Sequence, residues 1–505
     1  MRKIEFLENE FWWGDSVTNS IEMPIDCHKE YEVENVVGGD FPSEQAAPFF
    51  VSNKGRVLWG GNSFSIKFVN GIIEVSDDVK IENGGCSLHD AHMHCSSVFY
   101  KTSGKFPNEK FFVGPQYNTW IELKYNQNEE AIINYAQSII NNGFPPGVLM
   151  IDEGWAEDYG CYDFYPGRFK NPVKMIEKLH EMGFAVMLWI TPNISPDSSA
   201  YRELRDTDFL IHSEDGEVAI RKWWNGYSCV LDLSNPGARE WYNSKLQQCI
   251  NKYNIDGFKF DAGDQYFYRD TDNTYIKQTA QLHMREFDNF ALEYDFNEFR
   301  AVYGMSGKTI VCRLQDKTHS WNDEGIKKLC PSIILQGLLG YFYGCPDMVG
   351  GGEVTSFSEN SEFEEELYVR WLQASVLCPM VQFSIAPWRV LSKENLNIIK
   401  ENIKIREKYT PYILELAKNA AESAEPIVRH MEYQFPNEGF ESIADQFMLG
   451  DKILVAPVLE KGAVKRKVKL PQGIWVDDME VEYVGGQTIE VDAPIVRLPY
   501  FRRVE

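Results

Sequence analysis

Long apolar runs are missing from this sequence of 505 residues. None of its segments approaches the about 18 to 20 apolar residues that a membrane-spanning helix requires. Residues 1–15, MRKIEFLENEFWWGD, begin with two basic side chains and continue with acids, and they contain no apolar stretch long enough for the core of a signal peptide. We therefore expect neither a membrane-spanning segment nor export.

CxxC pairs are also missing, although the chain has ten cysteines. Several of them lie inside apolar, strand-like runs, which is typical of buried thiols that stay reduced. Disulfides persist mainly in oxidising compartments, so scattered cysteines of this kind suit a reducing compartment better. We predict a cytoplasmic location.

Positive charge is scarce, because 50 Lys and Arg residues stand against 75 Asp and Glu residues and give a formal net charge of −25. Such a surface repels phosphate backbones and anionic lipids, so we expect no nucleic acid and no membrane as a partner. The 44% hydrophobic and 14% aromatic residues are typical of a globular protein with aromatic side chains available for stacking. A neutral small-molecule or oligosaccharide substrate is compatible with this composition, and formation of a homo-oligomer stays open.

The length exceeds that of one ordinary core, which predicts one large domain with smaller ones attached. Residues 1–108 consist of short β-type runs broken by Gly and Asn, with no clear helical period, and predict an N-terminal β-sandwich. Residues 416–505 return to β-type runs, among them residues 464–470, in which Lys alternates with Val, and predict a C-terminal β-sandwich.

Between these, residues 109–415 alternate strand-like and helical segments. A helical stripe at residues 129–142 ends at Gly143, and a second helix opens with Asn171-Pro172. The candidate strands are residues 148–152, 185–190, 257–261, 309–313, 340–344 and 381–385. Apolar parallel strands with crossover helices predict an α/β fold, which we interpret as a (β/α)8 TIM barrel. A doubly wound open sheet is the alternative.

Polar side chains follow these strands, at the face where such a barrel has its active site. Asp261 leaves the run Gly257-Phe-Lys-Phe260, and Asp323 lies beside a tryptophan in Ser320-Trp-Asn-Asp-Glu324. Two carboxylates are the minimum equipment for cleaving a glycosidic bond, so the pair suggests a glycosidase. Lys259 lies on the same strand face as Asp261, because strand side chains alternate with a period of two, and its charge would help Asp261 to stay ionised.

Six motifs resemble those of glycoside hydrolase family 31, a family of retaining α-glycosidases. They are Tyr117-Asn-Thr-Trp120, Arg221-Lys-Trp-Trp-Asn-Gly226, Phe258-Lys-Phe-Asp-Ala-Gly263, Cys345-Pro-Asp-Met-Val-Gly-Gly351, Phe383-Ser-Ile-Ala-Pro-Trp-Arg389 and Leu454-Val-Ala-Pro-Val-Leu459. The likeness runs from about Trp120 to the C-terminus and resembles the branch with the myogenesis-regulating glycosidase and bacterial α-galactosidases. Where α-glucosidases of the family carry Asp-Met-Asn-Glu, this chain has Asp261-Ala-Gly-Asp264, which argues against plain α-glucosidase activity.

The resemblance implies that Asp261 is the nucleophile, which forms a covalent glycosyl-enzyme, and that Asp323 is the general acid/base. Retaining enzymes hold two such carboxyl groups about 5 to 5.5 Å apart. Around the acid the family pattern is Trp-x-Gly-Asp, whereas this chain has the shorter Trp321-Asn-Asp323 with Glu324 next to it, and the spacing to Cys345 favours Asp323. The purely structural alternative for Asp323 is a helix N-cap.

Sugar binding requires flat apolar faces and fixed polar groups. The candidates are Trp120, Asp152, Glu153, Trp155, Trp223, Trp224, Lys259, Arg313, Trp321 and Asp347, with Trp388 as a further pocket wall. Asp152 should accept hydrogen bonds from sugar hydroxyls, with Glu153 beside it. Arg313 should bind a hydroxyl or steady a carboxylate, and Asp347 could do likewise or merely brace its loop. For any single tryptophan, core packing is the alternative.

A competing signal is the segment Cys86 to Cys95, which contains His89, His92 and His94. Five soft or borderline ligands in ten residues could bind zinc, in a metal-dependent hydrolase or lyase that also uses Asp261 and Asp264. The spacing fits no tight structural zinc pattern, and a loop leading to the active mouth explains it equally well. We expect no metal and no cofactor.

The leading prediction is a retaining exo-α-glycosidase that releases a terminal sugar, from an α-galactoside, by double displacement. α-Glucosidase and α-xylosidase activity are the alternatives within the family, and they differ from it by one hydroxyl or hydroxymethyl group. A non-catalytic carbohydrate-binding protein on a degenerate barrel is disfavoured, because both acids, the lysine and the arginine are retained.

Overall fold

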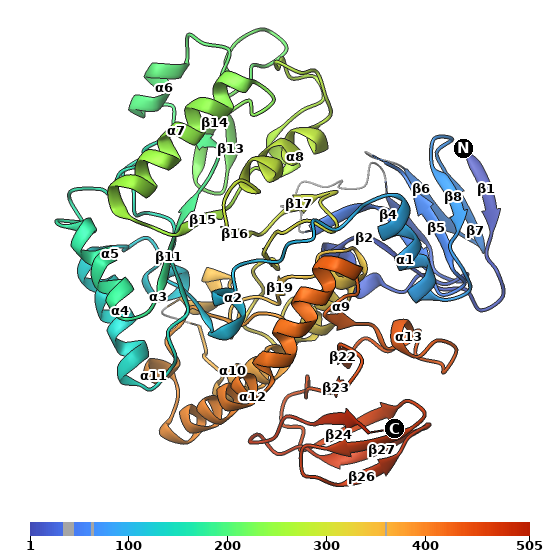
Figure 1. The fold of residues 1–505 in the computed structure, drawn as a ribbon. Helices are drawn as coiled ribbons and strands as arrows, with labels where there is room; N and C mark the ends of the chain where they lie inside the picture. Colours follow the sequence, from blue (N-terminus) through green and yellow to red (C-terminus); the bar gives the residue numbers. More distant parts are fainter. Residues whose placement is uncertain (34–44, 62–64, 359–360, 505) are drawn as a thin grey trace. The chain divides into compact units, whose positions relative to one another are not determined.

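The computed structural model describes residues 1–33, 45–61, 65–358 and 361–504, which form two compact units (Figure 1). Unit 1 comprises the described residues up to 113 and from 305 onward, and unit 2 comprises residues 114–304. These units follow the packing of the chain, whereas the domain boundaries at 108/109 and 415/416 follow the sequence pattern and stay a prediction.

The N-terminal part of unit 1 contains two antiparallel sheets. The first has the order β1 (Arg2–Glu5), β7 (Ile72–Val75), β6 (Ile66–Val69) and β3 (Tyr31–Val33). In the second, β2 (Trp12–Ser16) pairs with β4 (Gln45–Ser52), followed by β5 (Arg56–Trp59) and β8 (Lys80–Asn83). The rings of Phe50 on β4 and Phe68 on β6 lie 5.3 Å apart, so the two sheets pack face to face as in a β-sandwich.

The prediction that residues 1–108 lack helices is wrong at α1 (Leu88–Val98), and a short 3-10 helix, η1 (Val17–Glu22), precedes it. Ser87 caps α1 by accepting a hydrogen bond from the backbone N–H of Asp90. The buried face of α1 consists of Leu88, Ala91, His92, Cys95 and Ser96. The spacing of this face is helical, but His and Ser hide it from a search for apolar periodicity.

Unit 2 is built on five parallel strands in the order β16 (Phe296–Phe299), β15 (Gly257–Phe260), β11 (Ala185–Ile190), β10 (Val148–Ile151) and β9 (Gln116–Asn118). Every residue of these strands is buried, as expected for a parallel sheet covered on both faces. Because the strands are parallel, their C-terminal ends lie along one edge of the sheet.

Crossover helices connect these strands: α4 (Glu129–Asn141), α5 (Pro172–Glu181), α7 (Pro236–Tyr253) and α8 (Ala280–Ala291). Asn128, Asn171 and Asn235 cap the first three by accepting a backbone N–H hydrogen bond, and α4 and α7 both pack against α5 (Figure 1). Unit 2 also contains the short helices α3 (Trp120–Leu123), α6 (Ser199–Leu204) and η2 (Gln265–Phe267), and the short strand β17 (Val302–Tyr303). A small antiparallel sheet of this unit has the order β12 (Asn193–Ile194), β14 (Gly226–Val230) and β13 (Arg221–Trp223). The short helix α2 (Lys110–Val113) belongs to unit 1.

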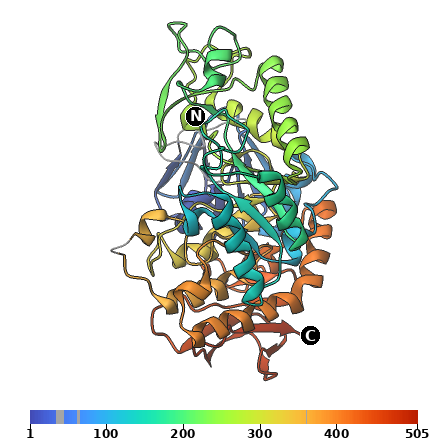
Figure 2. The same cartoon turned by 90° about the vertical axis from the view of Figure 1, so that its left-hand side faces the viewer.

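In unit 1 the alternation continues with three short strands, β18 (Cys312–Arg313), β19 (Gly344–Cys345) and β20 (Gln382–Phe383). β18 pairs in parallel with β19, and Met348 forms a parallel bridge with Gln382. The helices here are η3 (Ile326–Lys328), α9 (Leu329–Leu338), η4 (Val354–Phe357), α10 (Glu365–Ser375), α11 (Pro387–Val390) and α12 (Lys393–Ser423). α10 and α12, both orange, lie side by side in two views (Figures 1 and 2).

The C-terminal region forms a six-stranded sheet with the order β21 (Val428–Arg429), β22 (Phe447–Leu449), β23 (Ile453–Val455), β28 (Tyr500–Arg503), β25 (Ile474–Asp477) and β26 (Glu482–Val484). A two-stranded sheet, β24 (Lys465–Leu470) with β27 (Gln487–Asp492), packs on it, and a short helix, α13 (Met431–Gln434), also contributes to the core. Met448, Val468 and Trp475 lie in that core, so the two sheets form the predicted sandwich.

Within the described residues no helix is long and apolar enough to cross a membrane. The ten cysteines form no disulfide with one another, and seven of them are buried.

Candidate active site

Asp261 directly follows β15, at the strand end where the sequence predicts a catalytic carboxylate. Its backbone N–H donates to the carbonyl of Ile190 at 2.9 Å, so the pairing of β15 with β11 holds the residue in place. Ala262 and Gly263 have φ angles of +57° and +74°, and this left-handed pair turns the chain sharply away from the strand. Asp261 is 8% exposed, which leaves its carboxylate a narrow access to solvent.

Donors surround the Asp261 carboxylate. Its Oδ2 accepts a hydrogen bond from Trp189 Nε1 at 2.9 Å. Its Oδ1 accepts from the backbone N–H of Ala262 at 2.8 Å and from Arg300 Nε at 3.1 Å. These contacts fix the orientation of the carboxylate and stabilise its negative charge.

Lys259 lies between two acids. Its Nζ donates to Asp152 Oδ2 at 2.7 Å and is 3.8 Å from Asp261 Oδ2. Lys259 and Asp261 therefore share one face of the strand, as the alternation of side chains predicts. Asp152 is itself held at the end of β10, where its backbone N–H donates to Thr119 Oγ1 at 2.9 Å.

Arg300 is a second cation in direct contact with Asp261, and it was not among the predicted site residues. It follows β16, a strand absent from the candidate strands, and its second partner is Asp264 Oδ2 at 2.7 Å. The signal that could have found Arg300 is the run Phe296-Asn-Glu-Phe299 followed by a charged residue at its end. Arg313, which was expected to bind a hydroxyl or steady a carboxylate, pairs with Asp316 at 2.6 Å and with Asp347 at 3.1 Å.

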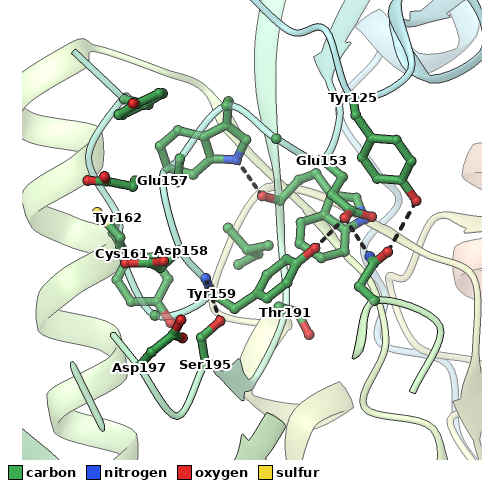
Figure 3. A pocket seen from close by; sticks show the side chains of 18 of the residues that line it. Tyr125, Glu153, Glu157, Asp158, Tyr159, Cys161, Tyr162, Thr191, Ser195 and Asp197 are labelled. Atoms are coloured by element: carbon green, nitrogen blue, oxygen red, sulfur yellow. Dashed lines mark hydrogen bonds between the residues drawn. The ribbon is translucent and has the colours of Figure 1, made fainter. Parts of the chain in front are cut away.

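Glu153, the residue after Asp152, lines a pocket of about 550 Å³ (Figure 3). Tyr159 and Asn225 both donate hydrogen bonds to its Oε1, and Tyr125 donates to Asn225 Oδ1 at 3.1 Å. Burial raises the pKa of Glu153 from its ordinary 4.5 to about 7, although the two hydrogen bonds oppose the shift. Tyr159 and Asn225 were not among the predicted site residues, although Asn225 lies within the motif of residues 221–226.

The candidate tryptophans divide into core and surface residues. Trp155 and Trp223 are buried; Trp155 Nε1 donates to the carbonyl of Trp189 at 2.7 Å, and Trp223 packs edge-on against Tyr159 at 4.8 Å. Trp224 is 44% exposed, and the guanidinium of Arg300 lies over its ring at 5.3 Å. Trp120 is half-buried against Tyr125. Among the candidate tryptophans of unit 2, Trp224 and Trp120 therefore offer accessible aromatic surface.

Asp347 braces a loop in unit 1. Its carboxylate accepts hydrogen bonds from the backbone N–H groups of Lys317, Met348 and Gly352 at 2.8, 2.6 and 3.1 Å, besides the bond to Arg313. Burial raises the pKa of Asp347 to about 7, against the opposing charge of Arg313. This geometry matches the bracing role considered for Asp347.

Asp323 lies in an exposed turn of unit 1, between Trp321 and Glu324. Among the described residues no hydrogen bond or ion pair involves its side chain. The helix-capping alternative does not apply, because the nearby 3-10 helix η3 has Gly325 at its N-cap and the backbone N–H of Glu324 donates to Asn322. Trp321 is half-buried and its Nε1 donates to Glu364 at 3.1 Å. Half-buried Trp388 begins the short helix α11 with Pro387.

Two family models match this chain. Residues 109–416 match the glycosyl hydrolases family 31 TIM-barrel domain, and residues 424–505 match the glycosyl hydrolase family 31 C-terminal domain. The chain belongs to glycosyl hydrolase family 31.

Curated relatives agree with this assignment. The myogenesis-regulating glycosidase of Mus musculus is 32% identical over 402 residues, which cover 77% of this chain and 56% of that protein. Alpha-glucosidase 2 of Bacillus thermoamyloliquefaciens is 26% identical over 412 residues, which cover 74% of this chain and 50% of that protein. The family 31 chain thus spans about half the length of the curated relatives it matches.

Solved structures show the same fold. A family 31 dextranase of Flavobacterium johnsoniae, complexed with isomaltotriose, has a TM-score of 0.84 at 21% identity and covers 99% of this chain and 66% of its own. A cycloalternan-degrading enzyme from Trueperella pyogenes has a TM-score of 0.84 at 19% identity and covers 100% of this chain and 80% of its own. The predicted (β/α)8 barrel with flanking β-sandwiches is confirmed, and β9, β10, β11, β15, β16, β18, β19 and β20 are its strands.

The histidine segment of this family 31 chain is helix α1, not a loop. His89 Nε2 contacts Glu425 at 2.9 Å, His94 Nε2 contacts Glu82 at 2.6 Å, and buried His92 contacts the carbonyls of Leu338 and Ala424. The three imidazoles thus have separate partners, and the part of the chain that the structure describes contains no group of three His, Cys, Asp or Glu residues arranged for a metal. This segment therefore offers no set of metal ligands for a metal-dependent hydrolase or lyase.

Proposed function

We propose that this chain is a retaining exo-α-glycosidase that releases a terminal sugar by double displacement, with α-galactosides as preferred substrates. The observation that supports it is the Asp261 carboxylate, which follows β15 and is held by Trp189 and Arg300 beside Lys259. A buried carboxylate that is oriented by donors and neutralised by cations suits a nucleophile, which must be ionised before it attacks.

In the proposed mechanism Asp261 attacks the anomeric carbon and forms a glycosyl ester. Asp323 protonates the glycosidic oxygen as the aglycone leaves, and then takes a proton from the water that hydrolyses the ester. Loss of its proton in the first step leaves Asp323 ionised, which is the form that accepts the proton of water in the second step. We expect the two carboxyl groups to lie about 5 to 5.5 Å apart in the productive state.

For the sugar we propose Asp152 and Glu153 as acceptors of hydroxyl hydrogen bonds, with Trp224, Trp120 and Trp321 as stacking surfaces. Trp155 and Trp223 are buried and contribute as packed walls. Arg313 and Asp347 support the loop in front of Gly350. We further propose domains at residues 1–108, 109–415 and 416–505. We also propose a cytoplasmic location, because ten cysteines that form no disulfide suit a reducing compartment.

α-Glucosidase or α-xylosidase activity is the second candidate, because relatives with these names match the chain, among them alpha-xylosidase XylQ of Lactiplantibacillus pentosus at 24% identity. Initial rates on aryl α-galactoside, α-glucoside and α-xyloside decide between them. We expect kcat/KM to be about 10²-fold higher on the galactoside, since a wrongly placed hydroxyl leaves buried polar groups unpaired. We expect a chelator to change no rate and Asp261→Asn to abolish all of them. A higher rate on another α-sugar would replace the galactoside assignment, and inhibition by chelator would contradict the mechanism.

We expect substrate binding to depend on pH through the ionisation of Glu153. Its pKa of about 7 leaves the carboxyl neutral below that pH and ionised above it. A sugar hydroxyl that donates to Glu153 binds the ionised form better, so KM should be about ten-fold lower at pH 8 than at pH 6. In Glu153→Gln we expect KM to stay at the higher value across this range.

The matched control is Glu157→Gln, which removes a second acid from the same pocket and should leave the pH dependence of KM unchanged. Protein stability gives an independent check. Because the pKa of Glu153 is higher in the folded protein than its ordinary value, ionisation destabilises the fold between about pH 4.5 and 7. The wild type should therefore lose stability relative to Glu153→Gln as pH rises through this window; a parallel pH dependence of the two proteins would contradict the assignment.

A further inference from the structure

Five buried side chains of unit 2 form a row of alternating charge, namely Asp152, Lys259, Asp261, Arg300 and Asp264. The successive nitrogen–oxygen distances are 2.7, 3.8, 3.1 and 2.7 Å. All five residues are at most 8% exposed, so water screens their charges poorly and each charge depends on its neighbours in the row. The proposed nucleophile occupies the centre, and an acid forms each end.

Asp264 lies at one end of this row and has no role in the mechanism proposed above. It is fully buried, its Oδ2 accepts from Arg300, and its Oδ1 has no hydrogen-bond partner among the described residues. Burial raises the pKa of Asp264, and the charge of Arg300 opposes the shift.

The turn after β15 has little freedom and fixes the position of Asp264. Gly263 has a left-handed φ of +74°, and a Cβ there would lie 2.5 Å from the ring of Phe287. Three residues after the proposed nucleophile, the chain therefore presents a second carboxylate to the same arginine.

We propose that Asp264 is a positioning residue that acts through Arg300 and keeps this cation paired throughout the two chemical steps. This inference rests on the proposed role of Asp261 as the nucleophile. When Asp261 attacks, its oxygen forms a bond to the anomeric carbon, the bond from that carbon to the leaving oxygen breaks, and Asp323 supplies the proton to the leaving group. Asp261 thereby becomes an ester and loses its negative charge.

The charges of the row explain why the end acids are needed. Within the row, three acids lie beside two cations before the attack, and two of these acids keep their charge after it. In the glycosyl-enzyme Lys259 still contacts Asp152 and Arg300 still contacts Asp264, so each cation keeps one charged acid of the row when the ester forms. In the free enzyme Asp264 draws part of the charge of Arg300 away from Asp261, which leaves the nucleophile more reactive.

The test compares Asp264→Asn with Asp264→Glu and with Asp477→Asn. Asp477 is a buried aspartate that pairs with Arg497 at 2.8 Å in the C-terminal region, so its variant controls for the general loss of a buried Asp–Arg pair. A 5-fluoro α-glycosyl fluoride of the preferred sugar serves as the probe, because it forms a glycosyl-enzyme that hydrolyses slowly. The rates of its formation and hydrolysis and the pH profile of kcat/KM are measured.

For Asp264→Asn we expect formation of the glycosyl-enzyme to slow by about ten-fold and its hydrolysis to become faster, since the full charge of Arg300 then stabilises the free carboxylate of Asp261. The acid limb of the kcat/KM profile should move down by about one pH unit for the same reason. Asp264→Glu keeps the charge and should keep the acid limb of the wild type, even if its packing lowers the rate. Asp477→Asn should leave both rates and the limb unchanged.

An unmoved acid limb in Asp264→Asn, or equal slowing of both steps, would overturn the positioning role. So would an acid limb in Asp264→Glu that moves, since that variant retains the carboxylate. Failure of the underlying function looks different: the wild type itself would then form no glycosyl-enzyme, and peptide mapping would find no label on Asp261.

Discussion

Asp261→Ala is expected to lower kcat/KM on an aryl α-glycoside by about 10⁴-fold or more, because the substitution removes the group that forms the covalent intermediate. The carboxylate that is lost accepts hydrogen bonds from Trp189, Ala262 and Arg300. Alanine leaves a space in their midst that is the size of a small anion. Steady-state rates and intact-protein mass spectrometry after reaction with a slow substrate measure the loss.

Azide makes the prediction specific. In Asp261→Ala it should enter the vacated space, attack the anomeric carbon and restore part of the rate, and the product should be the β-glycosyl azide because only one displacement has occurred. The matched control is Asp256→Ala, at the opposite end of β15, where the carboxylate accepts from Val186 and contacts His180. That variant should lose stability but keep turnover. An Asp261→Ala enzyme that stays active, or that yields no inverted azide, would rule out the nucleophile assignment.

The position of Asp261 could be predicted because it depends on local pattern. An apolar run that ends in a carboxylate indicates a buried strand, and the period of two puts Lys259 on the same face. The observed distance of 3.8 Å between Lys259 and Asp261 follows from these two facts. The alternation of strands and helices likewise predicts the barrel, since apolar parallel strands need crossover helices.

Arg300 could not be placed in the same way. It comes from β16, whose sequence Phe-Asn-Glu-Phe is half polar and lacks the continuous apolar run of β10 and β11. Its contact with Asp261 joins two strands, and only the pairing of β15 with β16 brings the residues together. The Tyr159 and Asn225 bonds to Glu153 are equally non-local, so no spacing in the sequence indicates them.

Residue type alone also misleads about burial. Trp155 follows a candidate strand and Trp224 lies within a quoted motif, and the two have the same chemistry. Trp155 is nevertheless 3% exposed and Trp224 is 44% exposed. In α1 a polar residue is buried where its type suggests exposure: His92 is fully buried and fills a core position. Both outcomes depend on which neighbours the fold supplies, which is a tertiary property.

For Asp323→Ala we expect a loss of hydrolytic activity that depends on the leaving group. In Asp323→Ala, hydrolysis of substrates with alkyl or sugar aglycones should fall by about 10³-fold or more, because these oxygens must be protonated as they leave. On dinitrophenyl glycosides the formation of the glycosyl-enzyme should change little, since that aglycone leaves without a proton. The side chain is exposed and makes no hydrogen bond among the described residues, so the thermal stability of the variant should equal that of the wild type.

The product formed with azide and a variant of the neighbouring Glu324 together test whether Asp323 is the acid/base. In Asp323→Ala azide should intercept the glycosyl-enzyme after the first displacement, so the product should be the α-glycosyl azide, opposite in configuration to the product of Asp261→Ala. Glu324→Ala is the matched control, because Glu324 is also exposed and adjacent, and it should retain the wild-type dependence on the aglycone. If Glu324→Ala instead shows the steep dependence and the α-azide, the acid/base is Glu324. If both variants lose activity equally on all aglycones, the turn at residues 320–325 positions the substrate and supplies no proton.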